Sequence, residues 1–202
     1  PKGPLYGVMI NGKEYIENSD KSKSPINQFF QKKENSPLSL VRIAINFDNA
    51  LESELIANQL KNMGYQVGLN MMQAHGKSEK EYIETAKSIS SWNVVDVLYF
   101  ADSLGNMLPE DVNKICQSLK KGWSGPVGIH THNNKNLALI NTIAAVEHGV
   151  TWCDSTITGM GRGAGNVTTE SLLLEMSRLG YHKGNANMSQ PAVDDFTKIK
   201  NK

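Results

Sequence analysis

Short apolar runs recur along the chain about every 30 residues, the length of one strand–helix–strand step, and each is followed by a longer amphipathic stretch. The runs are rich in β-branched and aromatic residues and are bounded by Gly, Pro, Asn or Asp, which is typical of strands buried on both faces. Apolar and polar residues do not alternate within them, so a sheet with one solvent-exposed face is not expected. The predicted strands are residues 5–10, 40–45, 65–72, 94–100, 127–129 and 152–158.

The amphipathic stretches between these runs carry helix start and stop signals. Residues 51–63 place leucines on roughly one stripe and end at Gly64, while Ser78 and Glu81 form a capping box that begins a helix running to about Trp92. Further helices are predicted over residues 109–121, 136–148 and 168–179. Strands that alternate with helices predict a parallel sheet with outer helices, either doubly wound or closed into a (β/α)8 TIM barrel.

Two polar segments fall outside this rhythm. Residues 11–37 contain one apolar island, Ile26, Phe29 and Phe30, and predict a long loop with a short helix that the phenylalanines fasten to the body. Residues 186–202 predict a polar C-terminal tail. The remainder, within residues 1–185, is expected to form one catalytic domain.

The charge balance narrows the function classes. The chain has 202 residues, 21 Lys and Arg against 20 Asp and Glu, and a formal net charge of +1, which gives no electrostatic footprint for nucleic acid or an anionic membrane. Its two cysteines lack metal-like flanking residues, so a reducing, cytoplasmic compartment is expected rather than a disulfide framework. No apolar run approaches about 18 residues, so no transmembrane span is predicted.

Polar residues gather where the predicted strands end, which is where parallel β/α folds carry their working residues. The sharpest signal is His130 and His132, which are two residues apart at the end of a strand and therefore point to the same face. Two imidazoles in one cavity suit a divalent metal, with Asp102 and Asn134 as neighbouring acceptors. The alternative is one histidine with an ordinary structural hydrogen bond and a second one by coincidence.

Two further segments lie at the same predicted edge. The glycine-rich residues 159–166, GMGRGAGN, predict a tight loop that lets backbone approach a ligand, with Asn166 near the metal; a loop needed only for packing is the alternative. Their G-x-G-x-x-A spacing follows the last strand and has no partner acid for a ribose, so a dinucleotide site is not favoured. The Ser103 hydroxyl can bind a substrate carboxylate, whereas an Asx turn at Asp102 is the structural alternative.

Together these motifs resemble the HMGL-like, or pyruvate carboxyltransferase, superfamily of metal-dependent (β/α)8 enzymes. The resemblance runs from about residue 5 to 180 and is carried by ADSLG, by GIHTHNNKNLALINTIAAVEHGV and by GMGRGAGN. The Ala-Asp-Ser triplet at 101–103 and Asn134 are typical of the branch of 4-hydroxy-2-oxovalerate aldolase rather than of the synthases. Arg162 and Lys135 depart from the aldolase pattern.

The resemblance implies an aldolase or lyase that cleaves or forms a C–C bond in a small 2-oxo acid through a pyruvate enolate. It implies a divalent metal, Mn²⁺ or else Mg²⁺, Co²⁺ or Zn²⁺, with His130, His132 and Asn166 as its ligands. The residues implied to contact the substrate are Ser103 and His130. Supporting residues of the implied site are Asp102, Asn134, Gly161 and Arg162. A Claisen-type acyltransferase of the isopropylmalate and homocitrate synthase branch is one alternative. A non-catalytic, metal- or ligand-binding barrel remnant is the other.

One departure from the family pattern is large. The family's first strand carries an Arg-Asp-Gly motif that supplies the third metal ligand, an arginine and, in the aldolases, a nearby base, yet no Arg-Asp pair occurs in this chain. The chain starts at Pro1, so we expect it to cover about barrel strands 3–8 with the first two βα units, and the catalytic residues on them, missing. A dehydrogenase-docking extension is also absent, so no partner dehydrogenase is expected, and we expect a homo-oligomer.

Overall fold

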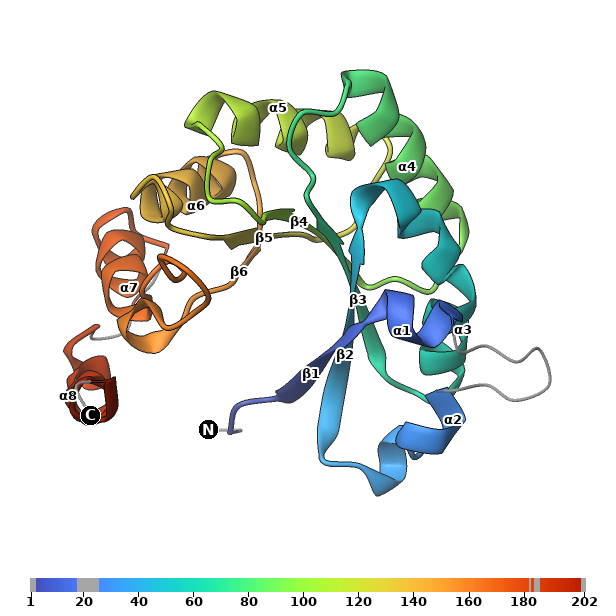
Figure 1. Cartoon of the computed structure of the whole chain (residues 1–202), viewed down its shortest axis with the longest axis horizontal. Helices are drawn as coiled ribbons and strands as arrows, with labels where there is room; N and C mark the ends of the chain where they lie inside the picture. Colours follow the sequence, from blue (N-terminus) through green and yellow to red (C-terminus); the bar gives the residue numbers. More distant parts are fainter. Residues whose placement is uncertain (1–2, 18–25, 182, 184–185, 201–202) are drawn as a thin grey trace. The chain divides into compact units, whose positions relative to one another are not determined.

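Six β-strands, all in parallel pairs, alternate with helices in the described part of the chain (Figure 1). This computed structural model describes residues 3–17, 26–181, 183 and 186–200. The strands are β1 (Tyr6–Asn11), β2 (Leu38–Asn46), β3 (Gln66–Met72), β4 (Val97–Asp102), β5 (Val127–Thr131) and β6 (Trp152–Cys153). The chain divides into two compact units: the first runs to Ala101 and also contains 117–127, and the second contains 102–116 and the chain from Gly128 onward.

Helices follow the strands as the sequence predicts. The α-helices are α1 (Gly12–Glu17), α2 (Ile26–Phe29), α3 (Glu54–Asn62), α4 (Glu79–Ser91), α5 (Pro109–Lys120), α6 (Ala138–Glu147), α7 (Thr169–Arg178) and α8 (Gln190–Lys200). Short 3-10 turns are η1 (Lys33–Asn35), η2 (Phe47–Ser53), η3 (Ile157–Gly159) and η4 (Ala186–Ser189). Within the described ranges, no helix combines the length and the apolar character that crossing a bilayer would require.

The core of the first unit lies on β2, β3 and β4. Register places Ile43 of β2 beside Leu69 of β3, and Leu69 beside Leu98 of β4; all three side chains are fully buried. Helices α3 and α4 lie along the same side of these strands and bury their apolar stripes there (Figure 1). Removing this apolar surface from water is the main favourable term that holds the unit together.

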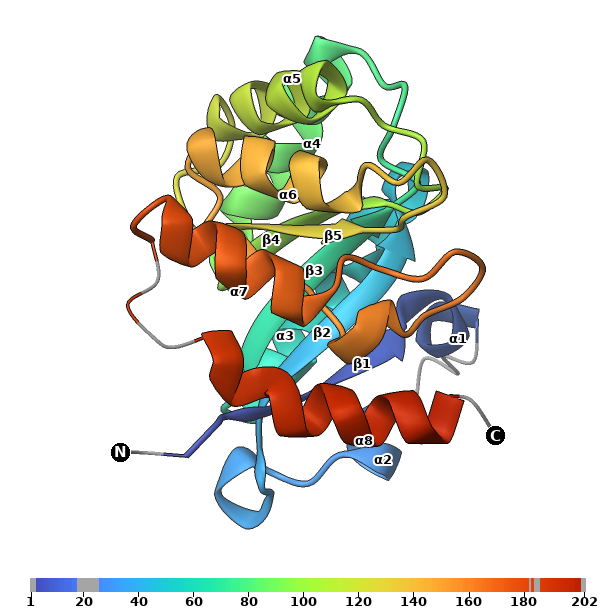
Figure 2. The ribbon, with the colours of Figure 1, turned by 90° about the vertical axis from the view of Figure 1, so that its left-hand side faces the viewer.

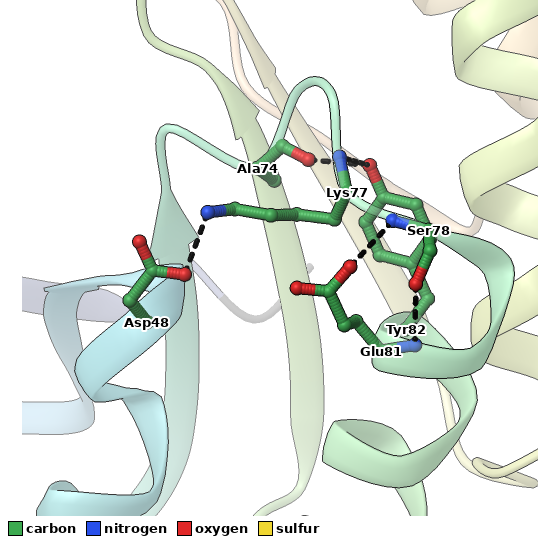
Figure 3. A network of polar contacts seen from close by, with 6 residues as sticks. All are labelled: Asp48, Ala74, Lys77, Ser78, Glu81 and Tyr82. Atoms are coloured by element: carbon green, nitrogen blue, oxygen red, sulfur yellow. Dashed lines mark hydrogen bonds and ion pairs between the residues drawn. The ribbon is translucent and has the colours of Figure 1, made fainter.

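The predicted capping box at the start of α4 is confirmed. The Ser78 backbone N–H donates to Glu81 Oε2 at 2.7 Å, and the Glu81 N–H donates to Ser78 Oγ at 3.3 Å (Figure 3). The helix ends at Ser91 with Trp92 as its C-cap, as expected. Ser78 also lowers the pKa of the Glu81 carboxyl, because its hydrogen bonds favour the charged form.

The prediction of a buried first strand is wrong. Of the residues in β1, only Ile10 is buried, while Tyr6 is 63% and Met9 55% exposed. The physical reason is that β1 pairs with β2 alone in the described part of the chain, so few neighbours cover it. The apolar run was therefore identified correctly as a strand, but its burial was not.

Residues 11–37 are more helical than the predicted loop, since α1, α2 and η1 all lie there; residues 18–25 are outside the described part. The apolar island packs in part. Ile26 is fully buried and the Phe30 ring meets the Tyr65 ring at 5.9 Å between centroids. Phe29 remains 72% exposed and its ring meets that of Tyr15 within the same segment, so of the two phenylalanines only Phe30 packs onto the body.

The second unit is built from β5, β6 and the helices after them. Its core cluster joins Ala138 of α6 to Val167, which precedes α7, and to Leu172 of α7; Cys153 of β6 packs against it. Figure 2 shows α6, α7 and α8 of this unit in turn. Residues 190–200 therefore form a helix, which contacts η3 and η4, where the sequence predicts only a polar tail.

The last strand is much shorter than predicted. Residues 152–158 were expected to be extended, but β6 ends at Cys153. The chain then turns, because Thr158 adopts a φ of 57° and its N–H donates to Glu170 Oε2 at 3.2 Å. A left-handed conformation at a β-branched residue is costly and ends extended backbone. The early end of β6 has a consequence for the site, since it moves Asp154 to a strand end.

Candidate functional site

The two histidines lie on one face of β5, as their spacing predicts. Thr131, between them, points to the opposite face, where its hydroxyl oxygen lies 3.0 Å from that of Thr142 on α6. His130 and His132 thus face away from α6, with ring centroids 5.1 Å apart and an interplanar angle of 79°. Alternation along the strand brings the two imidazoles side by side.

His130 has an acidic partner that sequence reasoning missed. Its Nδ1 lies 2.8 Å from Oδ2 of Asp154, the residue that follows β6. The signal was available, because an acid at the end of the neighbouring strand belongs to the same edge of a parallel sheet. The sequence pattern predicts a last strand that runs to residue 158, and Asp154 would then lie in the middle of that strand rather than at its end.

His132 lies in a more desolvated position. Burial lowers the pKa of His132, the nearby His130 and Arg162 lower it further, and Asp102 and a hydrogen bond with the Gly165 backbone oppose the change. The neutral imidazole, which is the form that binds metals, is therefore favoured at neutral pH. The exposed Arg162 thus acts on the site through its charge.

Asn166 lies beside His132, with which it forms an isolated antiparallel bridge. Its Nδ2 donates to the Met160 carbonyl at 3.1 Å, whereas its Oδ1 is buried and has no hydrogen-bond partner among the described residues. A Cβ at position 161 would lie 2.7 Å from Nδ2, so only glycine leaves room for this amide. The loop therefore holds a buried acceptor that lacks a donor or a cation.

The carboxylate of Asp102 forms hydrogen bonds with the backbone of the loop that follows it. Its side chain is buried, and its carboxylate accepts from the N–H groups of Asn106 at 3.0 Å and Met107 at 3.3 Å. These bonds match the turn-forming alternative that the sequence left open. The Asp102 carbonyl also accepts from the His132 N–H at 3.3 Å, and Ser103 follows half-buried, so the loop after β4 borders the histidines.

The loop after β5 contacts both the loop after β4 and the glycine-rich loop. The Lys135 N–H donates to the Gly105 carbonyl at 3.1 Å and its ammonium to the Asn106 carbonyl at 3.1 Å, which gives the unexpected lysine a structural role. Asn134 is exposed, and its Nδ2 would lie 3.8 Å from a Cβ at Gly163. Asp102 ends β4 and His130 lies in β5, while the other sequence-predicted site residues lie in the loops that follow β4, β5 and β6; all of them belong to the second unit.

The donor set fits a divalent cation. Two imidazoles and one amide oxygen are nitrogen and oxygen donors of the type that Mn²⁺, Co²⁺ or Zn²⁺ accept. The Asn166 oxygen is one of several buried side-chain atoms without a hydrogen-bond partner among the described residues, and it is the one that lies beside His132. Among the residues that the structure describes, no group of three or more His, Cys, Asp or Glu side chains could hold a metal. The ligand roles of His130, His132 and Asn166 stay a prediction.

Comparison with known proteins agrees with the motifs. The model of the HMGL-like family matches residues 41–197, most of the chain. The chain belongs to the HMGL-like family. The stated resemblance is therefore confirmed, including its lean to the aldolase branch: a 4-hydroxy-2-oxovalerate aldolase of Geobacillus genomosp. 3 is 38% identical over 147 residues, which are 73% of this chain and 43% of that protein.

Solved structures share the fold of this HMGL-like chain. The N-terminal domain of a candidate aldolase from Bacteroides vulgatus aligns with a TM-score of 0.78 at 30% identity, over 96% of this chain and 62% of that one. The HMG-CoA lyase of Bacillus subtilis aligns with a TM-score of 0.76 at 13% identity, over 99% and 71%. With the parallel strands, these similarities give the fold as a partial (β/α) barrel. The chain spans less than half, 43%, of the curated aldolase it matches.

Proposed function

We propose that the protein is a metal-dependent carbon–carbon lyase of the aldolase type, acting on a small 2-oxo acid. The observation that carries this proposal is the cluster at the C-terminal end of β5, formed by His130, His132 and the buried Asn166 oxygen, which has no hydrogen-bond partner among the described residues. Relatives named 4-hydroxy-2-oxovalerate aldolase, at 35% to 39% identity, support the substrate class.

In this proposal His130, His132 and Asn166 hold a divalent cation, Mn²⁺ first among those considered. When bound, the cation would supply Lewis-acid polarisation of the substrate carbonyl. The protein's part is to keep the donors in place: Asp154 Oδ2 holds the His130 imidazole, and the Asp102 carbonyl accepts from the backbone N–H of His132. The carboxylate of Asp102 keeps the loop after β4 in shape by accepting two backbone N–H groups.

The Ser103 hydroxyl and the Arg162 guanidinium are the groups we propose for the substrate carboxylate. A hydroxyl and an exposed cation beside the histidines can both donate to a carboxylate oxygen. Ser103 directly follows the buried Asp102, so its backbone is set by the same turn. Arg162 is close enough for its charge to lower the pKa of His132.

We further propose that the whole protein carries two βα units ahead of β1, and that an acidic third ligand and the catalytic base lie on them. Two observations support this part of the proposal. The matched region is only 43% of an aldolase's length, and the chain contains no Arg-Asp pair. The proton of the substrate 4-hydroxyl would go to that base.

The test is an activity assay on the full-length protein with Mn²⁺. A 4-hydroxy-2-oxo acid is supplied, and pyruvate release is followed with lactate dehydrogenase and NADH. The expected result is pyruvate formation that falls at least about a hundredfold in His130→Ala. His148→Gln is the matched control, because His148 follows α6, where its Nδ1 lies 2.9 Å from the Ala144 carbonyl oxygen, and it is not among the proposed site residues; it should keep full activity.

Two other outcomes would replace this function. Consumption of acetyl-CoA together with the 2-oxo acid would identify a Claisen-type acyltransferase of the synthase branch. Tight Mn²⁺ binding without turnover of either substrate would identify a non-catalytic metal-binding protein. If His130→Ala and the wild type release pyruvate equally, the histidine cluster has no part in the reaction.

A further inference from the structure

The contact between Asp154 and His130 follows from the register of two strands. Ile129 of β5 lies opposite Cys153 of β6, so the next residues, His130 and Asp154, also face each other. The Asp154 N–H donates to the Ile129 carbonyl at 3.1 Å, and its Oδ2 lies 2.8 Å from His130 Nδ1. Both side chains are mostly buried, 20% exposed for His130 and 21% for Asp154.

The backbone just after Asp154 is held by hydrogen bonds to the segment that leads into α7. The Thr156 N–H donates to the Val167 carbonyl at 3.1 Å, and the Thr169 N–H donates back to the Thr156 carbonyl at 2.9 Å. The Thr169 hydroxyl adds a bond of 2.9 Å to the Ser155 hydroxyl oxygen. Three bonds to the start of α7 therefore hold this short segment, so the carboxylate has a defined place before any ligand binds.

The chemistry of the contact selects one form of the imidazole. An ionised carboxylate has no hydrogen to donate, so a neutral His130 must carry its proton on Nδ1 and donate it to Asp154. Nε2 then has a lone pair on the opposite side of the ring. A carboxylate behind a histidine is a common outer arrangement of metal sites, where it fixes the ring and raises its basicity.

We propose that Asp154 is a positioning residue, which holds His130 in the Nδ1–H tautomer and directs Nε2 to the cation. This inference rests on the proposed function and deepens it by assigning a residue that the motifs do not contain. His132 differs, since its backbone N–H donates to the Asp102 carbonyl at 3.3 Å. The His130 ring, in contrast, is held by a replaceable acidic side chain.

Nitrogen NMR of the metal-free, full-length protein tests the tautomer directly. With ¹⁵N-labelled histidine, the wild type should show His130 with a protonated Nδ1 and an unprotonated Nε2, assigned by comparison with His130→Gln. In Asp154→Ala the two tautomers should become mixed, because the acceptor is gone. Asp154→Asn keeps an oxygen that can accept from Nδ1 and should retain most of the wild-type signal.

Mn²⁺ titration followed by electron paramagnetic resonance supplies a second readout that needs no turnover. Asp154→Ala should bind Mn²⁺ about 10- to 100-fold more weakly, the range seen when outer partners of a ligand are removed. Asp154→Asn should recover part of that loss. Ser155→Ala is the matched control: it removes the hydroxyl bond to Thr169 but keeps the carboxylate and the two backbone bonds of Thr156 that hold the segment, so its affinity should match the wild type.

The outcomes of these experiments distinguish a failure of the positioning role of Asp154 from a failure of the proposed function. Unchanged tautomers and unchanged Mn²⁺ affinity in Asp154→Ala overturn the positioning role and leave the aldolase proposal standing. Unchanged affinity in His130→Ala overturns the metal site itself and, with it, any role of Asp154 toward the cation. An equal loss of affinity in Ser155→Ala would mean that the segment's structure, rather than the carboxylate, is what matters, and would also overturn the inference.

Discussion

Two strand ends of this protein carry dense polar side chains, and they differ in how far those side chains satisfy one another. In the first unit, the segment after β3 forms a closed network (Figure 3). The Lys77 ammonium lies 2.6 Å from the Asp48 carboxylate, and the Tyr82 hydroxyl donates to the Ala74 carbonyl at 2.6 Å. The capping box of α4 completes this network, which we call the β3 network.

The end of β5 in the second unit is organised in the opposite way. The buried Asn166 oxygen has no partner in the described part of the chain, and the rings of His130 and His132 lie together with one identified partner each. The two ends therefore differ in how far their own polar side chains satisfy one another, and the proposed cation site at the end of β5 relies on the atoms that are left without such partners.

The largest expected difference between the two ends comes from a matched pair of glycines. Gly76, near the β3 network, and Gly165, in the loop beside Asn166, both have a φ of +82°. A Cβ at Gly76 would meet nothing within 4 Å, whereas one at Gly165 would lie 2.0 Å from the Gly159 carbonyl oxygen. Gly76→Ala should lower the free energy of unfolding by about 1–2 kcal/mol, and Gly165→Ala by more than about 3 kcal/mol.

Urea denaturation of the full-length variants measures both values. Gly165→Ala should also weaken Mn²⁺ binding, because the loop must shift and carry Asn166 with it. Equal destabilisation by the two substitutions would show that the loop beside Asn166 has room to adjust, and the contrast between the two ends would weaken accordingly.

The second prediction concerns metal affinity. His132→Ala removes a proposed ligand and should weaken Mn²⁺ binding at least about a hundredfold, which corresponds to about 2.8 kcal/mol. Lys77→Ala breaks the pair with Asp48 in the β3 network and should leave the affinity unchanged. Calorimetric titration compares the two. A similar loss in Lys77→Ala would contradict the view that the β3 network is purely structural.

The third prediction compares two helix caps. Ser78 caps α4 in the β3 network, and Thr168 caps α7, where its side chain accepts from the Ser171 N–H at 3.3 Å. Replacing either with Ala should lower the stability by about 1 kcal/mol, as measured by denaturation. Only Thr168→Ala should also weaken Mn²⁺ binding, by a few-fold, since Thr168 lies two residues after Asn166. Loss of affinity in Ser78→Ala would count against the comparison.

The smallest effect at neutral pH involves Cys153, which packs in the second unit. Burial, with a contribution from Asp154, raises the pKa of its thiol from 9.0 to about 11. Between these values the folded protein holds a proton that the unfolded chain releases, so the free energy of unfolding falls as the pH rises from 9.0 to about 11. Below that range the thiol contributes no pH dependence.

Denaturation at several pH values checks this sign. Cys153→Ala should remove part of the fall above pH 9.0 and should not change the slope near pH 7. Alkylation of Cys153 should likewise be slow at pH 8, because little thiolate is present in the folded protein. Fast alkylation at pH 8 without unfolding would show that the thiol is not buried as described.

Much of this fold could be predicted from local patterns. Buried strands, the Ser78–Glu81 capping box and the glycine after α3 each depend on residues within one turn or one strand, where periodicity and backbone geometry act directly. The same rule placed His130 and His132 on one face. The shared motifs added Asn166 and the family, and residues 41–197 match its model.

The burial of side chains and their hydrogen-bond partners could not be predicted from these local patterns, because both depend on residues far apart in the chain. The exposure of β1 depends on which strands flank it, and the early end of β6 on a turn at Thr158. The Asp102 carboxylate accepts from a backbone N–H of its own loop, and this is visible only in the hydrogen bonds of the structure. What the sequence by itself determined is therefore the order of elements and the residues that share a face.

Only the tertiary structure decided which polar atoms meet. Asp154 reaches His130 because the register of β5 with β6 sets two residues from neighbouring strands opposite each other, 24 positions apart. The contact depends on how the two strands pair, which a reading of either segment alone does not show. For the same reason, the unpartnered oxygen of Asn166 could be recognised only after every neighbouring donor had been placed.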